Sequence, residues 1–188
     1  MSAPVAFYRC GGAEAVPDTD PLRAGAGEVR VRLWRPGEAG GPQGFSMGRA
    51  ASVYAGFHKL GLFSNADYSA LCIEDSSGAL LHVSSIFPGY FRFPFMAPQD
   101  LQIGATYTAP EARGRKLAQL ALTEAVRTLD APGRSFWYLT EQSNAASVAV
   151  AKAAGFAYAG QGEKQPRFGM TLFGAYRLTE PAAQTDRA

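Results

Sequence analysis

The sequence predicts an α/β (α+β) domain, and three observations support this class. Segments with the apolar pattern of strands are interspersed with segments of helical periodicity, in the order β-α-β-β-β-α-β-α-β-β. The length of 188 residues suits one domain, which would bury about 68–75% of its unfolded surface. A hydrophobic content of 47% and a charged content of 18% are typical of a globular chain. We therefore expect a single domain over residues 1–188.

The first half of the chain alternates strand and helix patterns. Residues 28–34 alternate polar and apolar side chains, which indicates a half-buried strand. Residues 49–63 place apolar side chains at helical spacing, which indicates an amphipathic helix or two short ones. Residues 68–74 and 79–87 flank a turn sequence at 75–78 and are expected to form two antiparallel strands.

The second half continues with strand, helix, strand and helix. Residues 101–108 are an apolar run of strand length, and residues 117–129 carry an apolar stripe that a sheet must cover. A buried strand is expected at 136–140. Asn144 is expected to start a short alanine-rich helix, and Gly155 to end it. Two last strands are expected at 156–162 and 168–178.

Both ends of the chain are expected to be loosely ordered. Residues 1–28 are rich in Gly, Pro and Ala and predict an arm with at most a short strand near residues 5–9. Residues 179–188 predict a frayed tail.

Charge and residue counts argue against several classes of function. Lys and Arg exceed Asp and Glu by 18 − 16 = 2, so no nucleic-acid partner is expected. Two cysteines and two histidines provide neither a disulfide framework nor a zinc cluster, so no metal is expected. The sequence contains neither a basic-apolar leader nor an apolar run of about 18 residues. We expect a cytoplasmic protein without membrane insertion, as a monomer or homodimer.

Residues 44–48 read G-F-S-M-G, a formal match to the nucleophile elbow of serine hydrolases. That motif requires a buried strand directly before the serine, whereas a Gly/Pro-rich loop precedes Ser46. Ser46 is interpreted as a loop or helix-cap serine, and a serine hydrolase is a remote alternative.

The most informative stretch is residues 106–118, T-Y-T-A-P-E-A-R-G-R-K-L-A. Arg113, Gly114, Arg115 and Lys116 form what should be the first helical turn. Basic side chains are unfavourable there, because the unpaired amides and the dipole already make a helix start positive. The turn becomes favourable if an anion such as a pyrophosphate binds to the amides. A solvated basic face is the alternative, since neither common phosphate-loop motif is present.

A second stretch, residues 144–156, carries Asn144, Ser147, Lys152 and a Gly-Phe pair. Together with residues 113–118, it resembles the paired acetyl-CoA signatures of the GCN5-related N-acetyltransferase (GNAT) superfamily. The resemblance covers roughly residues 68–178. It implies a mixed, mostly antiparallel sheet of six to seven strands with helices on both faces. The sheet would be splayed between strands four and five to admit the pantetheine arm of acetyl-CoA.

The resemblance also implies which residues contact acetyl-CoA. Backbone groups of Tyr107 and Thr108 would meet the pantetheine amides, and the amides of residues 113–118 would bind the pyrophosphate. Arg113, Arg115 and Lys116 would balance its charge. The full set comprises Tyr107, Thr108, Arg113, Gly114, Arg115, Lys116, Leu117, Ala118, Asn144, Ser147 and Lys152.

The chain departs from the family pattern at three positions. Lys116 occupies the central glycine position of [QR]-x-x-G-x-[GA]. Ala151 stands where a tyrosine often protonates the leaving thiolate, and Gln102 stands where a glutamate often serves as base. The sequence therefore leaves the acid and the base of the reaction to other residues.

The implied reaction is direct acetyl transfer to a small-molecule primary amine, which must lose a proton. Asp100 is the first candidate for the base and Glu141 the second, with a structural role as the alternative for each. Tyr107 or Tyr158 would protonate the thiolate. A backbone amide near Tyr107 or Thr108 would bind the oxyanion.

The stretch from His82 to residue 104 is similar to acetyltransferases encoded near bacterial surface-polysaccharide genes. This implies an amino sugar or sugar nucleotide as acceptor, with Arg92 binding a phosphate. The substrate-binding residues would be His82, Phe91, Arg92 and Phe93. A non-catalytic acyl-CoA-binding regulatory module of the same fold is the main alternative.

Overall fold

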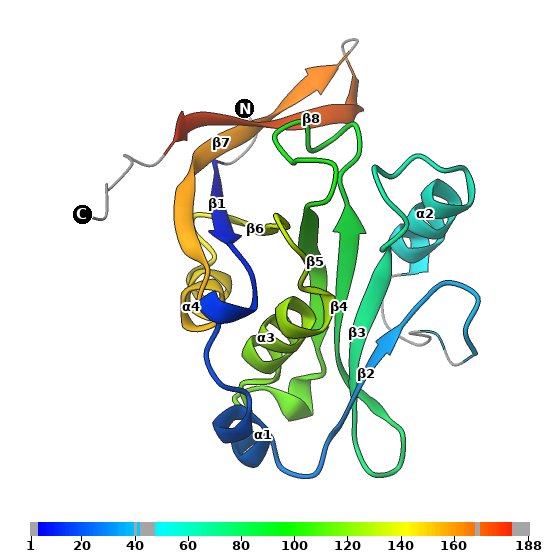
Figure 1. Ribbon diagram of the computed structural model, residues 1–188, viewed down its shortest axis with the longest axis vertical. Helices are drawn as coiled ribbons and strands as arrows, with labels where there is room; N and C mark the ends of the chain where they lie inside the picture. Colours follow the sequence, from blue (N-terminus) through cyan, green and yellow to red (C-terminus); the bar gives the residue numbers. More distant parts are fainter. Residues whose placement is uncertain (1–3, 40, 42–47, 168–169, 182–188) are drawn as a thin grey trace.

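The molecule is built on one mixed sheet, as seen in the computed structural model, which describes residues 4–39, 41, 48–167 and 170–181 (Figure 1). The strands lie in the order β2-β3-β4-β5-β6-β1-β7-β8, and all neighbours are antiparallel except β5 and β6. The mixed, mostly antiparallel sheet is thus confirmed, with more strands than the expected six to seven. The strands are Val5–Cys10 (β1), Arg30–Trp34 (β2), Ser69–Glu74 (β3), Leu80–Pro88 (β4), Leu101–Thr108 (β5), Phe136–Glu141 (β6), Ala157–Arg167 (β7) and Met170–Pro181 (β8).

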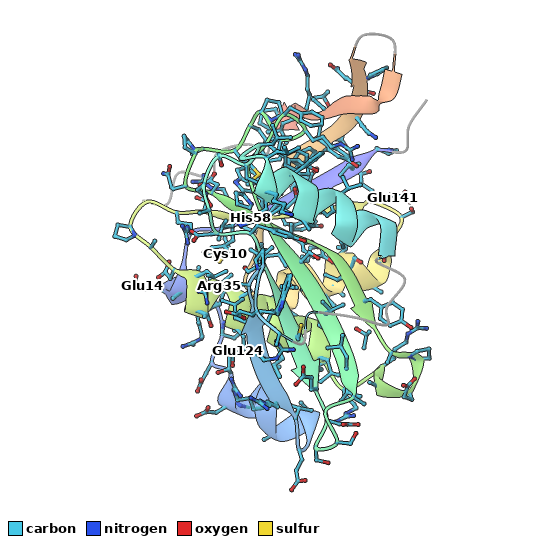
Figure 2. All side chains as sticks on the ribbon, turned by 90° about the vertical axis from the view of Figure 1, so that its right-hand side faces the viewer. Cys10, Glu14, Arg35, His58, Glu124 and Glu141 are labelled. Carbon is cyan, nitrogen blue, oxygen red and sulfur yellow. The ribbon has the colours of Figure 1, made fainter. Side chains whose placement is uncertain are left out.

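Helices lie on both faces of the sheet, as expected. On one face, α3 (Leu117–Leu129) packs against β3, β4 and β5, with α1 (Asp20–Ala26) and α4 (Ala145–Ala153) beside it. Its buried stripe includes Leu120, Leu122 and Val126. On the other face lies α2 (Gly48–Lys59), and Figure 2 views the molecule from the side of this helix. Two short 3-10 turns, Ala13–Ala15 (η1) and Pro110–Ala112 (η2), complete the secondary structure of the described residues.

The N-terminal segment is an integral part of the sheet. The short strand expected near residues 5–9 is present as β1, whereas the expectation of a loosely ordered arm around it is wrong. β1 lies between β6 and β7 and pairs with both (Figure 1). Five of its six side chains are buried, including Phe7 at 0% exposure. A strand covered on both faces has a continuous apolar run, which the composition of the surrounding Gly- and Pro-rich sequence obscured. α1 was not predicted either.

The sheet is split between β5 and β6, as the resemblance implied. These are the strands expected at residues 101–108 and 136–140, the fourth and fifth of the predicted order. The two strands pair only through Leu101↔Phe136, Gln102↔Trp137 and Ile103↔Tyr138. Beyond these residues β6 turns away from β5. On its other side, β5 carries a bulge against β4, where Ala105 adopts a positive φ of 46°. A bulge bends a strand and increases its twist, which favours the separation of β5 from β6.

The space between α2 and the sheet is filled by aromatic side chains. Tyr54 and Phe57 of α2 contact rings from β4 and from the loop after it, with Tyr54 and Phe87 centroids 4.2 Å apart. Tyr68 stacks on Phe87. No helix within the described ranges combines the length and apolar character needed to cross a membrane.

Candidate active site

The loop between β5 and α3 leaves the start of α3 without internal hydrogen-bond partners. Gly114 (φ 82°) and Lys116 (φ 58°) turn the chain through left-handed conformations before the helix begins at Leu117. No side chain caps the helix at Lys116. Within the part of the chain that the structure describes, no acceptor bonds the backbone N–H groups of residues 114–119. The helix therefore presents free amides and the positive end of its dipole.

These amides border a cavity of about 500 Å³, which we call the α3-face cavity. The end of β5, the loop and the first turn of α3 form one wall. Ala146 and Val150, one turn apart on α4, form the opposite wall. The lining residues are Thr106, Tyr107, Thr108, Ala112, Arg113, Gly114, Lys116, Leu117, Ala118, Gln119, Ala146 and Val150.

Two of the three basic residues line this cavity, and the third does not. Arg113 and Lys116 are among its lining residues. Arg115 instead donates from both Nε and a terminal nitrogen to the carbonyl oxygen of Ala26, at the C-terminal end of α1. A cation is favourable at a helix C-terminus. The expected role of the Arg115 side chain at a phosphate is thus not supported, and the residue ties α1 to the loop.

The downstream stretch contributes to the cavity through different residues from those predicted. The Asn144 side chain accepts a hydrogen bond of 3.1 Å from the Ser147 amide and caps α4, as expected of its helix start. Lys152 is exposed on α4. Asn144, Ser147 and Lys152 do not line the α3-face cavity; Ala146 and Val150 do. The signature therefore shapes the helix that forms the wall.

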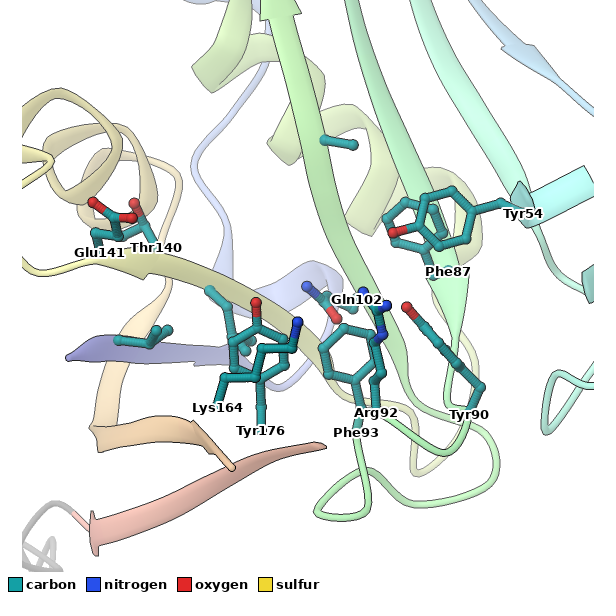
Figure 3. Close-up of a pocket in the computed structure, with 13 residues that line it drawn as sticks. Tyr54, Phe87, Tyr90, Arg92, Phe93, Gln102, Thr140, Glu141, Lys164 and Tyr176 are labelled. Carbon is teal, nitrogen blue, oxygen red and sulfur yellow. The ribbon is translucent and has the colours of Figure 1, made fainter. Parts of the chain in front are cut away.

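A second cavity of about 350 Å³ opens on the side of α2 and is called the α2-face cavity (Figure 3). Arg92 and Phe93, both predicted to bind substrate, line it, as does Glu141. The ring of Phe93 stacks on that of Tyr176 at 5.6 Å. The full lining comprises Val5, Tyr54, Phe87, Tyr90, Arg92, Phe93, Gln102, Ala105, Leu139, Thr140, Glu141, Lys164 and Tyr176.

The α2-face cavity brings together cations from distant parts of the chain. Arg92 comes from the loop after β4, and Lys164 comes from β7. Figure 3 shows their charged ends directed into the same space, whereas Glu141 lies apart from them at the end of β6. Burial lowers the pKa of Lys164, and the positive charge of Arg92 lowers it further. The potential inside the cavity is therefore positive around these two residues.

Two phenols of the α2-face cavity, Tyr90 and Tyr176, remain protonated at neutral pH. Burial raises the pKa of Tyr90 far above its usual value and also raises the pKa of Tyr176. Neither hydroxyl can act as a general base; Tyr176 can donate a hydrogen bond, and Tyr90 shares one with Tyr54.

Gln102 places an unpaired oxygen in the α2-face cavity. It is 7% exposed, and its Oε1 has no hydrogen-bond partner among the described residues. Figure 3 shows its amide directed toward Arg92 and Phe93. An unpaired buried carbonyl oxygen costs about 1–3 kcal/mol, so a donor from a ligand would be stabilising here.

The two cavities border neighbouring residues of β5 at the split in the sheet. Ala105 lines the α2-face cavity, and the next residue, Thr106, lines the α3-face cavity. Both residues belong to the bulged part of β5 that has lost its partner β6. A ligand that reached this point from one face would therefore meet a ligand that entered from the other.

Asp100, the first candidate for the base, lines neither cavity. It is 4% exposed and accepts three hydrogen bonds, from the Ala97 amide (3.0 Å), the Ser135 amide (3.0 Å) and Trp137 Nε1 (2.9 Å). These bonds join the start of β5 to the start of β6. The structure thus makes Asp100 an anchor of the fold, which favours the structural role named as the alternative to a base.

Two predicted substrate residues also lie outside the α2-face cavity. His82 is fully buried in β4, with its ring nitrogens 2.7 Å from Thr108 Oγ1 and 2.9 Å from Ser84 Oγ. Burial lowers its pKa to about 4. Phe91 packs against Phe57 and Tyr90 and is not among the lining residues. His82 and Phe91 are therefore packing residues.

The sequence did not identify Tyr54, Tyr90, Lys164 and Tyr176 as site residues. They come from α2, the loop after β4 and the β7–β8 hairpin, and only the folded sheet brings them together. Ser46 lies outside the described residues. No group of three or more His, Cys, Asp and Glu residues that could hold a metal ion occurs in the described ranges.

Comparison with known proteins agrees with the architecture. A model of the acetyltransferase (GNAT) family matches residues 54–156, which is more than half of the chain. This protein therefore belongs to the GNAT family of acetyltransferases. The resemblance to that family is confirmed by this match. A search of curated proteins found no match.

Solved structures share the fold at low sequence identity. A protein from Novosphingobium aromaticivorans assigned to the GNAT family aligns over 86% of this chain and 62% of its own, with a TM-score of 0.53 and 15% identity. A Drosophila protein aligns over 84% of this chain and 48% of its own, with a TM-score of 0.51 and 17% identity. This chain thus spans less than two thirds of either protein, and the similarity concerns the fold alone.

Proposed function

We propose that this protein is an acetyl-CoA-dependent N-acetyltransferase that acts by direct transfer on a small-molecule primary amine, with an amino sugar among the candidates. One observation carries the proposal. The uncapped start of α3 opens onto the α3-face cavity, and this cavity and the α2-face cavity border adjacent residues of β5 where β5 separates from β6. Donor and acceptor can therefore approach the same strand from opposite faces.

The donor fits the α3-face cavity in its charge and shape. Its diphosphate would accept hydrogen bonds from the amides of residues 114–118, with Arg113 and Lys116 beside it. Its pantetheine arm would pass between the end of β5 and the small side chains of α4. The thioester would then lie at the bulge near Ala105, where both cavities end.

The chemistry requires one proton acceptor and one proton donor. The neutral amine nitrogen forms a bond to the acetyl carbon, the C–S bond breaks, the amine gives up a proton, and the thiolate takes one. Glu141 is the carboxylate that lines the α2-face cavity and is our candidate for the base. Tyr107 lines the α3-face cavity and is our candidate for the acid, whereas Tyr158 is 45% exposed and lines neither cavity.

Positioning supplies a large part of the rate enhancement. Holding two reactants in line can contribute on the order of 7–11 kcal/mol, and general base assistance adds roughly 10²–10⁴-fold. The backbone of β5 at the bulge offers amide groups for the oxyanion, because β6 no longer pairs there.

A second candidate function follows from Gln102. A carboxamide at the position where the family often has its base favours a non-catalytic acyl-CoA-binding module. One assay separates the two: release of the free thiol from acetyl-CoA in the presence of a panel of primary amines, including amino sugars. The proposal predicts turnover with at least one amine. Micromolar CoA binding with no thiol release from any amine would favour the module.

A further inference from the structure

We infer that the acceptor carries an anionic group beside its amine, with Arg92 and Lys164 binding the anion and Gln102 binding the amine nitrogen. This inference rests on the proposed function and specifies its substrate class. The anion is a carboxylate or a phosphate, since either accepts hydrogen bonds from a guanidinium and an ammonium.

The first observation is the convergence of two cations on a cavity of about 350 Å³. Arg92 and Lys164 are brought there by the loop after β4 and by β7, and their charged ends share one space (Figure 3). Like charges held this close repel each other and cost free energy. An anionic ligand between them would be attracted by both charges.

The second observation is that tyrosine hydroxyls line the cavity together with the two cations. Tyr90 and Tyr176 line the same cavity, and the charge of Arg92 acts on both hydroxyls. Because the Tyr176 phenol stays protonated, it can donate a hydrogen bond to an anion's oxygen, whereas the Tyr90 hydroxyl shares a hydrogen bond with Tyr54. The stacked rings of Phe93 and Tyr176 give the carbon skeleton of a small ligand a flat apolar wall.

The third observation is the unpartnered oxygen of Gln102. Its residue is more than nine-tenths buried, and its amide is directed into the cavity (Figure 3). A neutral primary amine can donate one N–H to this oxygen and keep its lone pair for attack on the thioester. Gln102 and Ala105 line the same cavity three residues apart on β5, so an amine bound to Gln102 lies on the strand that would also hold the thioester.

These positions separate the two ends of the acceptor. The anion lies near the loop after β4 and β7, and the amine lies on β5. Glu141, exposed at the end of β6, is the one carboxylate among the lining residues and stands apart from the two cations (Figure 3). The cavity thus distinguishes an anionic amine from a neutral one by charge.

The test compares matched amines with wild-type protein and with Lys164→Met. The probes are 2-amino-2-deoxyglucose with and without a 6-phosphate, and an α-amino acid with its amide. For the wild type we expect kcat/KM to be at least about tenfold higher for one anionic member than for its neutral partner. In Lys164→Met the preference should shrink to about threefold or less, mainly through KM. Which pair shows the preference identifies the anion.

Two controls keep this inference separable from the proposed function. Lys59→Met removes an exposed lysine that lines neither cavity and should leave the preference unchanged. Calorimetric titration of the same probes into the CoA-bound protein measures binding without turnover.

Turnover with equal kcat/KM for charged and neutral partners would overturn the inference and leave the acetyltransferase intact. Absence of turnover, with binding of an anionic probe that Lys164→Met weakens about tenfold, would overturn the enzyme and keep the anion site. Equal binding by wild type and Lys164→Met would overturn the inference.

Discussion

At the residue scale, the same types of side chain serve either the fold or the cavities, and burial decides which. Asp100 lies beside the paired start of β5 and β6, and Glu141 lies at the end of β6 beyond the split; of the two, only Glu141 lines either cavity. The sequence could place both near this split, because strand order brought them there. It could not show that the Asp100 carboxylate already accepts hydrogen bonds from two backbone amides and an indole.

The anchoring role of Asp100 predicts a loss of stability on substitution. Both oxygens of the Asp100 carboxylate accept hydrogen bonds from N–H groups. In Asp100→Asn one of these oxygens becomes an NH₂ group that faces an N–H donor, so we expect the free energy of unfolding to fall by about 3 kcal/mol. Urea denaturation measures this, and Glu14→Gln, at an exposed position, is the control. Unchanged stability with strongly reduced turnover would return Asp100 to the chemistry.

His82 predicts a pH dependence of stability. Burial lowers its folded-state pKa from 6.5 to about 4, so between these values the unfolded chain binds a proton that the folded chain does not. The stability from neutral His82 is complete above about pH 6.5 and declines as pH falls toward 4, by about 3 kcal/mol in all. Urea denaturation across this range should show a shallower decline for His82→Gln. Equal slopes for the two proteins would contradict the buried neutral ring.

At the element scale, the chain's helix boundaries were largely predictable. Asn144 caps α4 through its side chain, and Gly155 follows the helix with φ 87°, as both residue types predicted. The start of α3 also followed from the sequence, because a glycine and a basic cluster interrupt the strand-to-helix connection. η2 within that loop, and the left-handed conformation of Lys116, were not predictable from the pattern.

Gly155 gives a test of how closely α4 approaches its neighbours. A Cβ at this position would lie 2.3 Å from the carbonyl oxygen of Ala15, and the substituted residue would have to keep the positive φ of Gly155. We expect Gly155→Ala to lower the free energy of unfolding by about 2 kcal/mol or more. Gly25→Ala within α1 is the matched control, because no atom lies within 4 Å of its Cβ. The control variant should have an unchanged or higher free energy of unfolding, which thermal or urea denaturation measures. An equal loss of stability in both variants would contradict the close packing at Gly155.

At the scale of the whole molecule, the sheet consists of two parts that separate beyond Ile103 and Tyr138. The order of elements predicted the mixed sheet, and the family resemblance predicted the split. The position of β1 between β6 and β7 was not predictable, because a pairing between the first and last parts of a chain leaves no local pattern. The same reason hid Lys164 and Tyr176, which reach the α2-face cavity from the hairpin of β7 and β8.

The split is what allows one strand to serve two ligands. The α3-face cavity has the uncapped helix start at one end and the bulge of β5 at the other. The α2-face cavity begins at that bulge and ends among Arg92, Lys164 and the phenols. A donor and an acceptor bound in this way would bring thioester and amine together at Ala105.

The most direct test of this account is calorimetric titration of CoA into wild-type protein, Gly114→Gln and Gly114→Glu. Both variants introduce a side chain of similar size at φ 82°, where no atom lies within 4 Å of the added Cβ. Only the glutamate adds a negative charge beside the amides. We expect Gly114→Glu to raise the Kd for CoA at least about tenfold relative to Gly114→Gln, with a smaller difference at high salt. Equal binding by the two variants would show that the diphosphate does not bind at the start of α3, and the central claim would fail.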